Sequence, residues 1–239
     1  MLISCVSISI HVRVRRMEHT ITLQERKVCI MKTESTARQG GEKQVKTHHI
    51  TVSAMLSALA FVLMYIEISV PIMPAFVKFD FSDLPALLGA FALGPIYGVI
   101  IELVKNLLHL IVSQSMFIGE LSNFILGAVF TFIAGFIYRL HKTKRMALIA
   151  GLSGAVIMGI VSIFSNLFIV YPVYVSVYFG GDVNVCISMY QAIVPMLHLD
   201  SLLSCLLIFN LPFTIVKGII DVLITFAVYK KISPIIKSF

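Results

Sequence analysis

Hydrophobic residues form five long runs along this chain, and short polar segments separate them. The runs lie at roughly 50–70, 84–112, 120–138, 146–171 and 200–229, the last interrupted at Pro212. A helix that crosses a bilayer needs about 20 predominantly apolar residues. The pattern therefore predicts an all-α integral membrane protein in which every run crosses the membrane at least once.

The basic residues predict how often the chain crosses. Lys and Arg accumulate in the segments 1–49, 139–145 and 230–237, whereas 113–118 and 171–208 contain none. Short cytoplasmic segments of membrane proteins are enriched in Lys and Arg, so the three basic segments should share that side. An even number of crossings must then separate the first two basic segments. Only three runs lie between them, so one of these runs must cross twice.

The run at 84–112 is the one that can cross twice, because "GPIYG" lies near its middle. Gly-Pro pairs commonly end or begin helices. Each half would rise only about 20–24 Å, short of the roughly 30 Å hydrocarbon core, so flanking residues or neighbouring helices must cover it. A single long, tilted helix is the alternative. The preferred prediction is a bundle of six transmembrane helices with both termini cytoplasmic.

Composition agrees with a membrane domain at 50–239 that follows a polar tail at 1–49. The chain is 58% hydrophobic and 13% charged, whereas soluble domains average about 45–50% and about 25%. Residues 1–49 have the mixed, non-periodic character of a disordered basic tail. Met31 is an alternative start, which would make 1–30 a mis-annotated extension. The net charge of +7 lies in tails and loops, so we expect no nucleic-acid partner.

Three charged residues, Lys78, Asp80 and Asp83, lie beside the second run in "VKFDFSDLPALLGAFALGP". Six crossings place this stretch on the outer face of the membrane, together with 113–118 and 171–208. We interpret it as the lip of a ligand site near the extracellular face. The expected ligand is a small organic molecule such as a vitamin.

Ionisable residues inside the runs suggest where the site continues. Charged groups in a membrane are costly and normally face the bundle interior and pair. On the second run one helix face carries Glu102, Lys105, Asn106 and His109, and Glu102 can pair with Lys105 at i, i+3. This face is either a self-neutralised structural patch or part of a polar cavity.

The last run carries Lys217 and Asp221 at i, i+4, a spacing at which the two can neutralise each other. Asn210 and Thr214 precede Lys217 on the same face, and Pro212 frees a backbone carbonyl there. This is more polarity than packing requires, so we expect Lys217 to face the ligand.

Asn166 is the strongly polar side chain deep in the fourth run, and it serves either interhelical hydrogen bonding or ligand contact. Tyr171, Tyr174 and Tyr178 follow it and are candidates for interfacial anchors. Nearer the N-terminus, small residues recur at i, i+4 in "SAMLSALA" and allow another helix to approach closely. They are Ser53, Ala54, Ser57 and Ala58. That partner helix is either internal or part of another subunit.

The sequence lacks the motifs of nucleotide-binding proteins, metalloproteases and serine hydrolases, so we expect neither an enzyme nor a metal site. The four cysteines have no metal-ligand spacing and are interpreted as free thiols; they are Cys5, Cys29, Cys186 and Cys205.

Four blocks of sequence together resemble the riboflavin-specific S components of energy-coupling factor (ECF) vitamin transporters. The blocks are "KFDFSDLPALLGAFALGP", "GVIIELVKNLLHLI", "GELSNFILG" and "NLPFTIVKGIIDVLITFAVYKKISPII". The resemblance covers about 50–239 and implies a six-helix protein of the cell membrane that captures riboflavin from outside. It also implies partners, namely a transmembrane coupling subunit and two cytoplasmic ATP-binding subunits, and no cofactor.

The resemblance also implies roles for single residues. Lys78, Phe79, Asp80 and Asp83 fall in the first loop, which closes over the ligand in that family. Asn166 and Lys217 correspond to polar positions that contact the flavin, and Ala54 and Ala58 to a pair that faces the coupling subunit. Asn210 and Thr214 are predicted as substrate-binding with Lys217 because they share its helix face. One departure occurs at Thr214, where the family pattern PFN-x-x-K has Asn; Thr keeps a hydroxyl but lacks the paired donor and acceptor of an amide.

The candidate site charges are nearly balanced, which suits an uncharged ligand such as riboflavin better than a polyanion. They are Lys78, Lys105 and Lys217 against Asp80, Asp83, Glu102 and Asp221. Two alternatives stay open: an S component for another vitamin or precursor, and an ion-coupled secondary transporter that uses Glu102 and Lys105.

Overall fold

The computed structural model describes residues 47–71, 73–74, 77–113, 117–194 and 201–238. The predictions of a disordered tail and of an alternative start at Met31 lie outside these residues. The chain divides into two units, 1–49 and 50–239, and the architecture below is that of the second unit.

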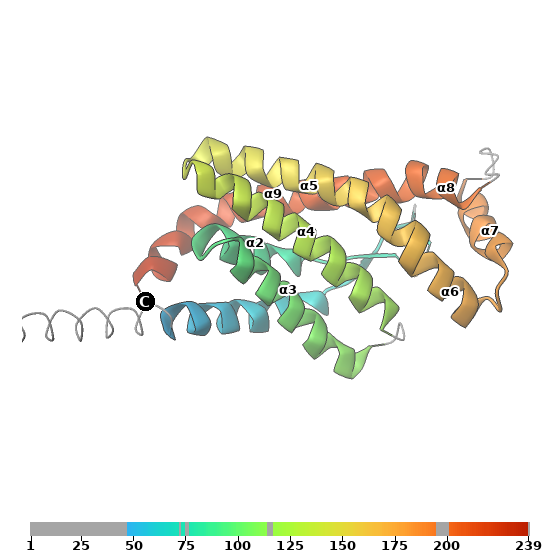
Figure 1. The fold of residues 1–239 in the computed structure, drawn as a ribbon, viewed down its shortest axis with the longest axis horizontal. Coiled ribbons are helices and arrows are strands. Elements are labelled where there is room, and N and C mark those ends of the chain that lie inside the picture. Colours follow the sequence, from blue (N-terminus) through green and yellow to red (C-terminus); the bar gives the residue numbers. More distant parts are fainter. Residues whose placement is uncertain (1–46, 72, 75–76, 114–116, 195–200, 239) are drawn as a thin grey trace, which may run out of the picture. The chain divides into compact units, whose positions relative to one another are not determined.

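The second unit is mostly helical (Figure 1). The N-terminal helix Thr47–Met64 leads into a two-stranded antiparallel hairpin, β1 Ile68–Ser69 and β2 Lys78–Phe79, in which Ile68 pairs with Phe79. The helices that follow are α2 Asp83–Ala92, α3 Pro95–His109 with the 3-10 turn η1 Leu110–Val112, α4 Ile118–Leu140, α5 Lys144–Ser165 and α6 Tyr171–Tyr178. The chain then forms α7 Val183–Ile193, α8 Leu202–Cys205 and α9 Leu211–Ser238. The hairpin is the one departure of the described residues from the all-α prediction.

Five helices in the described part of the chain are long and apolar enough to cross a membrane. They are Thr47–Met64, Pro95–Val112, Ile118–Leu140, Lys144–Tyr178 and Leu202–Val228. They correspond to the five hydrophobic runs, so the helical membrane architecture predicted from the pattern is confirmed at this level. The ten-residue α2 is too short to be counted with them.

The second hydrophobic run is divided at the position that the sequence predicts. Gly94 has a φ of 120°, a conformation that L side chains rarely adopt, and Pro95 begins α3, where its missing N–H costs nothing. The alternative of one long helix is therefore wrong. Helix α2 rises only about 15 Å. Most of its residues are buried, and it packs against α3, α4 and α9.

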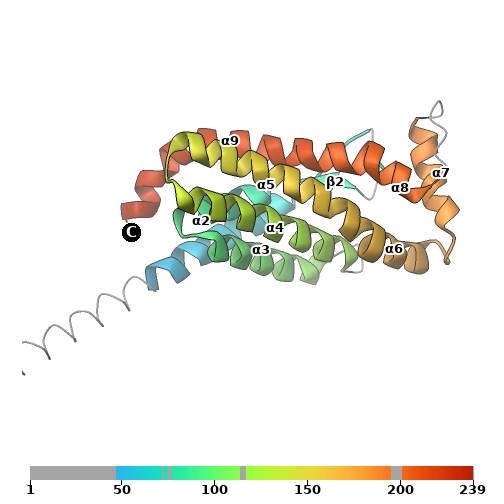
Figure 2. The ribbon, with the colours of Figure 1, turned by 45° about the horizontal axis from the view of Figure 1, so that its top comes forward.

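Helices α4, α5 and α9 pack closely through small residues. An ideal Cβ on Gly154 of α5 would lie 2.9 Å from the Phe130 carbonyl oxygen of α4, and one on Gly218 of α9 would lie 2.7 Å from Cβ of Ala155. Phe130, Ala155 and Val222 form the buried apolar core between these helices. Figure 2 shows α5 lying between α4 and α9 along most of its length.

Two π-helical segments each end two residues before a proline. Asn166–Val170 (η2) precedes Pro172, and Leu206–Asn210 (η3) precedes Pro212. A proline lacks the N–H of the regular helix and its ring clashes with the carbonyl four residues earlier; the wider π turn accommodates both effects. The predicted interruption at Pro212 is therefore wrong, because the helix continues through it.

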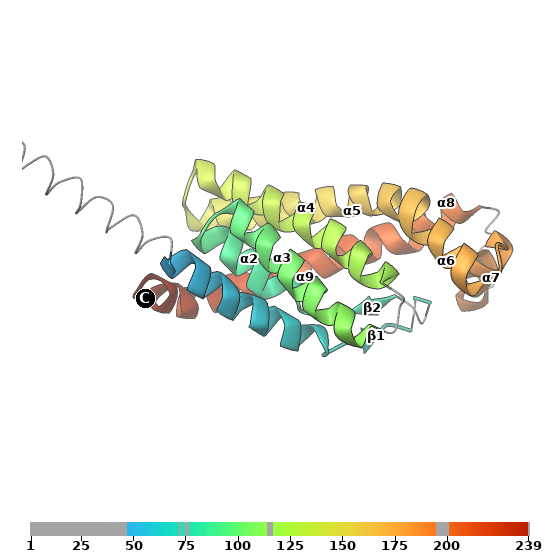
Figure 3. The same cartoon turned by 60° about the horizontal axis from the view of Figure 1, so that its bottom comes forward.

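The loops fall into two groups at opposite ends of the helices. Figures 1 and 3 place strands β1 and β2, the end of α3, the start of α4, and the helices α6, α7 and α8 toward one end. The α2–α3 turn and the α4–α5 connection lie toward the other. Met73, Ile118, Tyr171 and Tyr190 share one buried apolar cluster at the first end. This is the grouping that the charge argument requires, and the side of the membrane stays a prediction.

Candidate functional site

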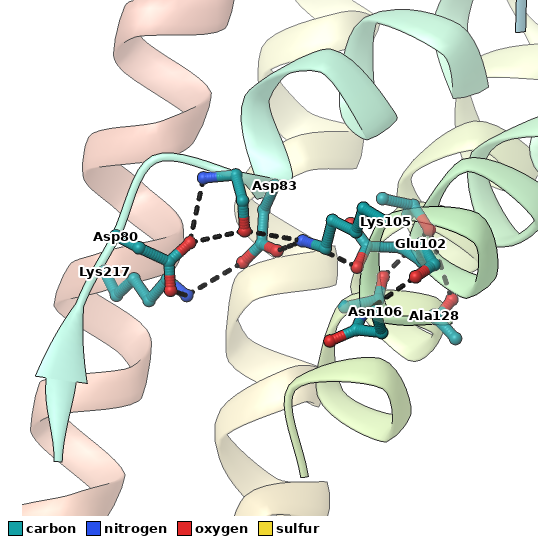
Figure 4. A network of polar contacts seen from close by, with 10 residues as sticks. Asp80, Asp83, Glu102, Lys105, Asn106, Ala128 and Lys217 are labelled. Carbon is teal, nitrogen blue, oxygen red and sulfur yellow. Dashed lines mark hydrogen bonds and ion pairs between the residues drawn. The ribbon is translucent and has the colours of Figure 1, made fainter. Parts of the chain in front are cut away.

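The first loop and the last helix meet at a pair of charge contacts. Lys217 Nζ of α9 lies 3.2 Å from Asp80 Oδ2 and 3.1 Å from Asp83 Oδ2 (Figure 4). Lys217 and Asp80 are 137 positions apart in the chain. The structure thus brings together three of the residues that the sequence predicts for substrate binding.

Lys105 extends this contact into the centre of the bundle. Its Nζ donates to Asp83 Oδ1 and to Ser82 Oγ, the latter at 2.8 Å, and lies 2.8 Å from Glu102 Oε2. Lys105 and Glu102 have no exposed surface. We call the alternating series Asp80, Lys217, Asp83, Lys105 and Glu102 the ion-pair chain.

The local sequence explains how the loop end of the ion-pair chain, at Asp80 and Asp83, is positioned. Asp80 Oδ1 accepts from the Ser82 backbone N–H at 2.8 Å and from the Ser82 hydroxyl, a turn that Asp forms with the residue two positions on. Asp83 occupies the first turn of α2, where the helix dipole favours negative charge. Local contacts therefore hold the Asp80 carboxylate, whereas the place of Asp83 in α2 favours only its negative charge.

A glycine on α4 makes room for Glu102, at the other end of the ion-pair chain. An ideal Cβ at Gly127 would lie 2.3 Å from Glu102 Oε2, so any larger residue would displace the carboxylate. The Glu102 oxygens have no hydrogen-bond partner with good geometry, and the contact with Lys105 is an ion pair by distance. Glu102 is thus held by charge and packing.

Two predictions about helix faces need correction. Lys217 pairs with Asp80 and Asp83, whereas both carboxylate oxygens of Asp221 are buried without a hydrogen-bond partner. Asp80 and Asp83, rather than Asp221, form the direct ion pairs with Lys217, because the loop and α2 bring two carboxylates to Nζ. Asp221 interacts with Lys217 only by charge, without a direct contact. The Glu102–Lys105 pair is confirmed, but the patch is not self-contained, since Lys105 also binds Asp83.

The other members of that face of α3 have different neighbours. Asn106 Nδ2 donates to the Glu102 carbonyl oxygen at 2.8 Å. His109 Nδ1 lies 2.9 Å from Glu120 Oε1 of α4. These two side chains therefore fix α3 internally and against α4.

Lys78 lies apart from the ion-pair chain. Its ammonium group pairs with Glu67 beside the hairpin, where both side chains are substantially exposed. Sequence reasoning missed Glu67. It directly precedes strand β1, which pairs with the strand β2 that begins at Lys78. This strand pairing is the signal that could have revealed the contact. Phe79, next to Lys78, is buried, and its ring contacts Phe81 and Phe213 of α9.

A second, uncharged polar cluster lies at the loop end of the helices. The Tyr190 hydroxyl of α7 donates to Asn210 Oδ1 at 2.7 Å, Asn210 Nδ2 donates to the Tyr171 hydroxyl at 3.3 Å, and the two hydroxyls also share a hydrogen bond. We call Tyr171, Tyr190 and Asn210 the tyrosine cluster. Burial raises the pKa of Tyr190 above its ordinary value, so the hydroxyl keeps its proton at physiological pH.

The tyrosine cluster changes two expectations. Tyr171 is almost completely buried and is therefore no interfacial anchor, whereas Tyr178 is exposed. Tyr190 was missed, because nothing in its local sequence distinguishes it from other tyrosines. Asn166 and Asn210 are both buried and lie in the π-helical segments η2 and η3, and Thr214 is buried one turn before Lys217.

The small residues of the N-terminal helix divide between two faces. Ser53 and Ser57 are buried, and their hydroxyls donate to the Ile50 and Ser53 carbonyl oxygens. Ala54 and Ala58 are exposed. The serine pair thus serves internal packing, and the alanine pair is open to another protein or to lipid.

The described residues include no group of three or more His, Cys, Asp or Glu side chains that could hold a metal ion. Cys186 and Cys205 are free and buried, as predicted; Cys5 and Cys29 lie outside the described residues.

Comparison with known proteins places this geometry in a family. The family model described as "ECF transporter, substrate-specific component" matches residues 48–229. The chain belongs to this family. The resemblance of the four sequence blocks is thereby confirmed, and the protein is a multi-pass membrane transport component.

Individual ECF substrate-specific components are similar over most of the chain. The riboflavin transporter RibU of Staphylococcus aureus (strain TCH60) is 35% identical over 192 residues, which cover 79% of this chain and 91% of that one. The riboflavin transporter FmnP of Bacillus subtilis (strain 168) is 28% identical over 193 residues, covering 80% and 94%. A solved S component of a bacterial ECF transporter is 30% identical with a TM-score of 0.63 and covers 80% of this chain and 99% of its own.

Proposed function

We propose that this chain is the riboflavin-binding S component of an ECF transporter. It captures the vitamin at the membrane and delivers it with a transmembrane coupling subunit and two cytoplasmic ATP-binding subunits. Relatives that share most of its length are named riboflavin transporters. Because these relatives are named transporters and not enzymes, we propose neither an enzymatic step nor a cofactor for this protein.

The observation that carries this proposal is the contact between the first loop and α9. Lys217 joins Asp80 and Asp83, and Phe79 of the same loop packs against Phe213 one turn before Lys217. A loop attached in this way closes over a ligand that lies against α9. Aromatic side chains then cover an apolar ring, and the polar groups engage its edge and hydroxyl tail.

Charge in the ion-pair chain supports an uncharged ligand. Lys78 does not contribute, because it is paired with Glu67. The ion-pair chain therefore has three carboxylates against two ammonium groups, and Asp221 adds a fourth carboxylate nearby. A phosphate would enter a region with no positive excess. Riboflavin therefore fits better than its phosphorylated form.

For the membrane arrangement we propose six crossings, with α2 as the short second one, and both termini in the cytoplasm. The site then lies near the extracellular face, and residues 1–49 form a cytoplasmic tail. A Lys78→Cys variant in intact cells should react with a membrane-impermeant maleimide. Labelling only after permeabilisation would reverse the orientation.

Binding is tested with the full chain purified in detergent. Riboflavin fluorescence should be quenched on addition of protein, with tight saturable binding, and FMN should compete weakly. Lys217→Ala and Asn166→Ala should weaken binding while the melting curve stays cooperative. If riboflavin does not bind but another vitamin does, the S-component assignment stands and the ligand is wrong.

A further inference from the structure

Both carboxylate oxygens of Asp83 bind lysines, and the residue is buried. Its Oδ1 accepts from Lys105 and its Oδ2 lies 3.1 Å from Lys217 Nζ, and the residue is 1% exposed. Asp80, in contrast, lies at the loop end of the ion-pair chain and keeps some exposure. The two aspartates that the sequence predicts as equivalent substrate contacts therefore differ in role.

Lys105 and Glu102 are the members of the ion-pair chain that lie farthest from the loop. Both are completely buried, and Glu102 lies against Gly127 of α4. Neither has exposed surface with which to contact a ligand. The position of Asp83 nevertheless depends on them, because Lys105 is its second cationic partner.

We propose that Asp83, Lys105 and Glu102 form a positioning relay that fixes the Lys217 ammonium group for the ligand. A lysine side chain has high rotamer entropy, and a ligand that must order it binds less tightly. The relay supplies this order in advance by anchoring the partner of Lys217 to α3 and α4. Lys217 is the contact residue, and the three relay members act only through it; the inference rests on the proposed function for the identity of the ligand.

A double-mutant cycle between Glu102 and Lys217 tests the relay. Lys105→Met is the obvious variant, but it leaves the buried Glu102 carboxylate without a cation and is prone to misfold. Glu102→Gln keeps size and shape at the far end of the relay. It should weaken riboflavin binding roughly three- to thirty-fold in the otherwise unchanged protein, given coupling energies typical of residues in one network.

The decisive comparison is the same substitution in a Lys217→Met background. There Glu102→Gln should change the affinity by less than about two-fold, because the group it acts through is gone. A merely structural role for Glu102 would weaken binding equally in both backgrounds. Equal weakening, or no weakening in either, would overturn the relay. Lys142→Met, a charge removal in the exposed α4–α5 connection, should bind like the unchanged protein.

A second cycle uses melting temperature without any flavin, so that the outcome does not depend on the ligand. Glu102→Gln and Lys217→Met should lower the melting temperature by less together than the sum of their separate effects. Additive shifts would overturn the relay even if riboflavin binds. Non-additive shifts in a protein that binds no riboflavin would keep the relay and reject only the ligand.

Discussion

Two buried polar networks connect distant parts of this protein, one charged and one neutral. The ion-pair chain joins the first loop, α2, α3 and α9 at the centre of the helices, and the tyrosine cluster joins α6, α7 and η3 at their loop end. The first holds charges inside a membrane domain, where each unpaired charge is expensive. The second holds only neutral donors and acceptors.

The difference indicates how each network responds to damage. Removal of one member of a buried ion pair leaves an uncompensated charge, which typically costs about 3–5 kcal/mol. Removal of a hydroxyl from a neutral network leaves an unsatisfied polar group, which costs about 1–3 kcal/mol. The ion-pair chain should therefore dominate stability, and the tyrosine cluster should adjust the position of α7.

The largest expected effect is that of Lys105→Met. It removes the cation shared by Asp83 and Glu102 and should lower the free energy of unfolding by about 3–5 kcal/mol, measured in detergent by thermal or denaturant unfolding. Lys142→Met is the matched control and should change it by less than about 0.5 kcal/mol. A loss below about 1 kcal/mol for Lys105→Met would mean that the charged network is no more sensitive than the neutral one.

Next comes Gly127→Ala, which disturbs the ion-pair chain without removing any charge. The new methyl group would overlap Glu102 Oε2, and overpacking of this kind costs about 1–3 kcal/mol. Gly135→Ala on the same helix would meet Pro95 at 2.9 Å and should cost a similar amount. Only Gly127→Ala should also weaken riboflavin binding, as measured by fluorescence titration; equal affinities for the two variants would separate Gly127 from the site.

Tyr190→Phe tests the neutral side of the comparison. It removes the hydroxyl that donates to Asn210 and should lower the free energy of unfolding by about 1–3 kcal/mol. Tyr65→Phe is the control, because the Tyr65 side chain is exposed. It should lower the free energy of unfolding by less than about 0.5 kcal/mol. A cost for Tyr190→Phe as large as that for Lys105→Met would remove the distinction between the networks.

The raised pKa of Tyr190 adds a pH dependence with a definite sign. Burial favours the neutral phenol in the folded state, so above about pH 10 the unfolded chain loses this proton first. Stability from this group should be constant at neutral pH and should fall above about pH 10. Tyr190→Phe should reduce that alkaline loss in a series of melting curves.

Sequence patterns predicted what depends on neighbours along the chain. The five long helices, the division at Gly94 and the Glu102–Lys105 pair all follow from local spacing, and the structure contains each of them. The grouping of Lys78, Asp80 and Asp83 with Lys217 was predicted from polarity and resemblance. The structure brings three of these four together.

What the sequence could not predict depends on contacts between distant segments. The i, i+4 spacing suggested Asp221 as the partner of Lys217, but α2 supplies Asp83 at 3.1 Å instead. Tyr190 acquires its role only when α7 packs beside η3. Helical spacing reports which residues share a face, and it carries no information about which face of another helix lies opposite.

The smallest effect on the ion-pair chain and the tyrosine cluster is expected from substitutions at Ala54 and Ala58, which belong to neither network. Ala54→Leu combined with Ala58→Leu enlarges the exposed face of the N-terminal helix and should change the free energy of unfolding by less than about 0.5 kcal/mol, with riboflavin affinity unchanged. Small residues permit close helix approach within lipid, so the same variant should lose co-purification with the coupling subunit and vitamin uptake in cells. Ser57→Leu, one position away but buried, should instead destabilise the protein itself. If the alanine variant weakened binding as Ser57→Leu does, the alanine face would belong to internal packing, and the docking surface would have to be sought on another helix.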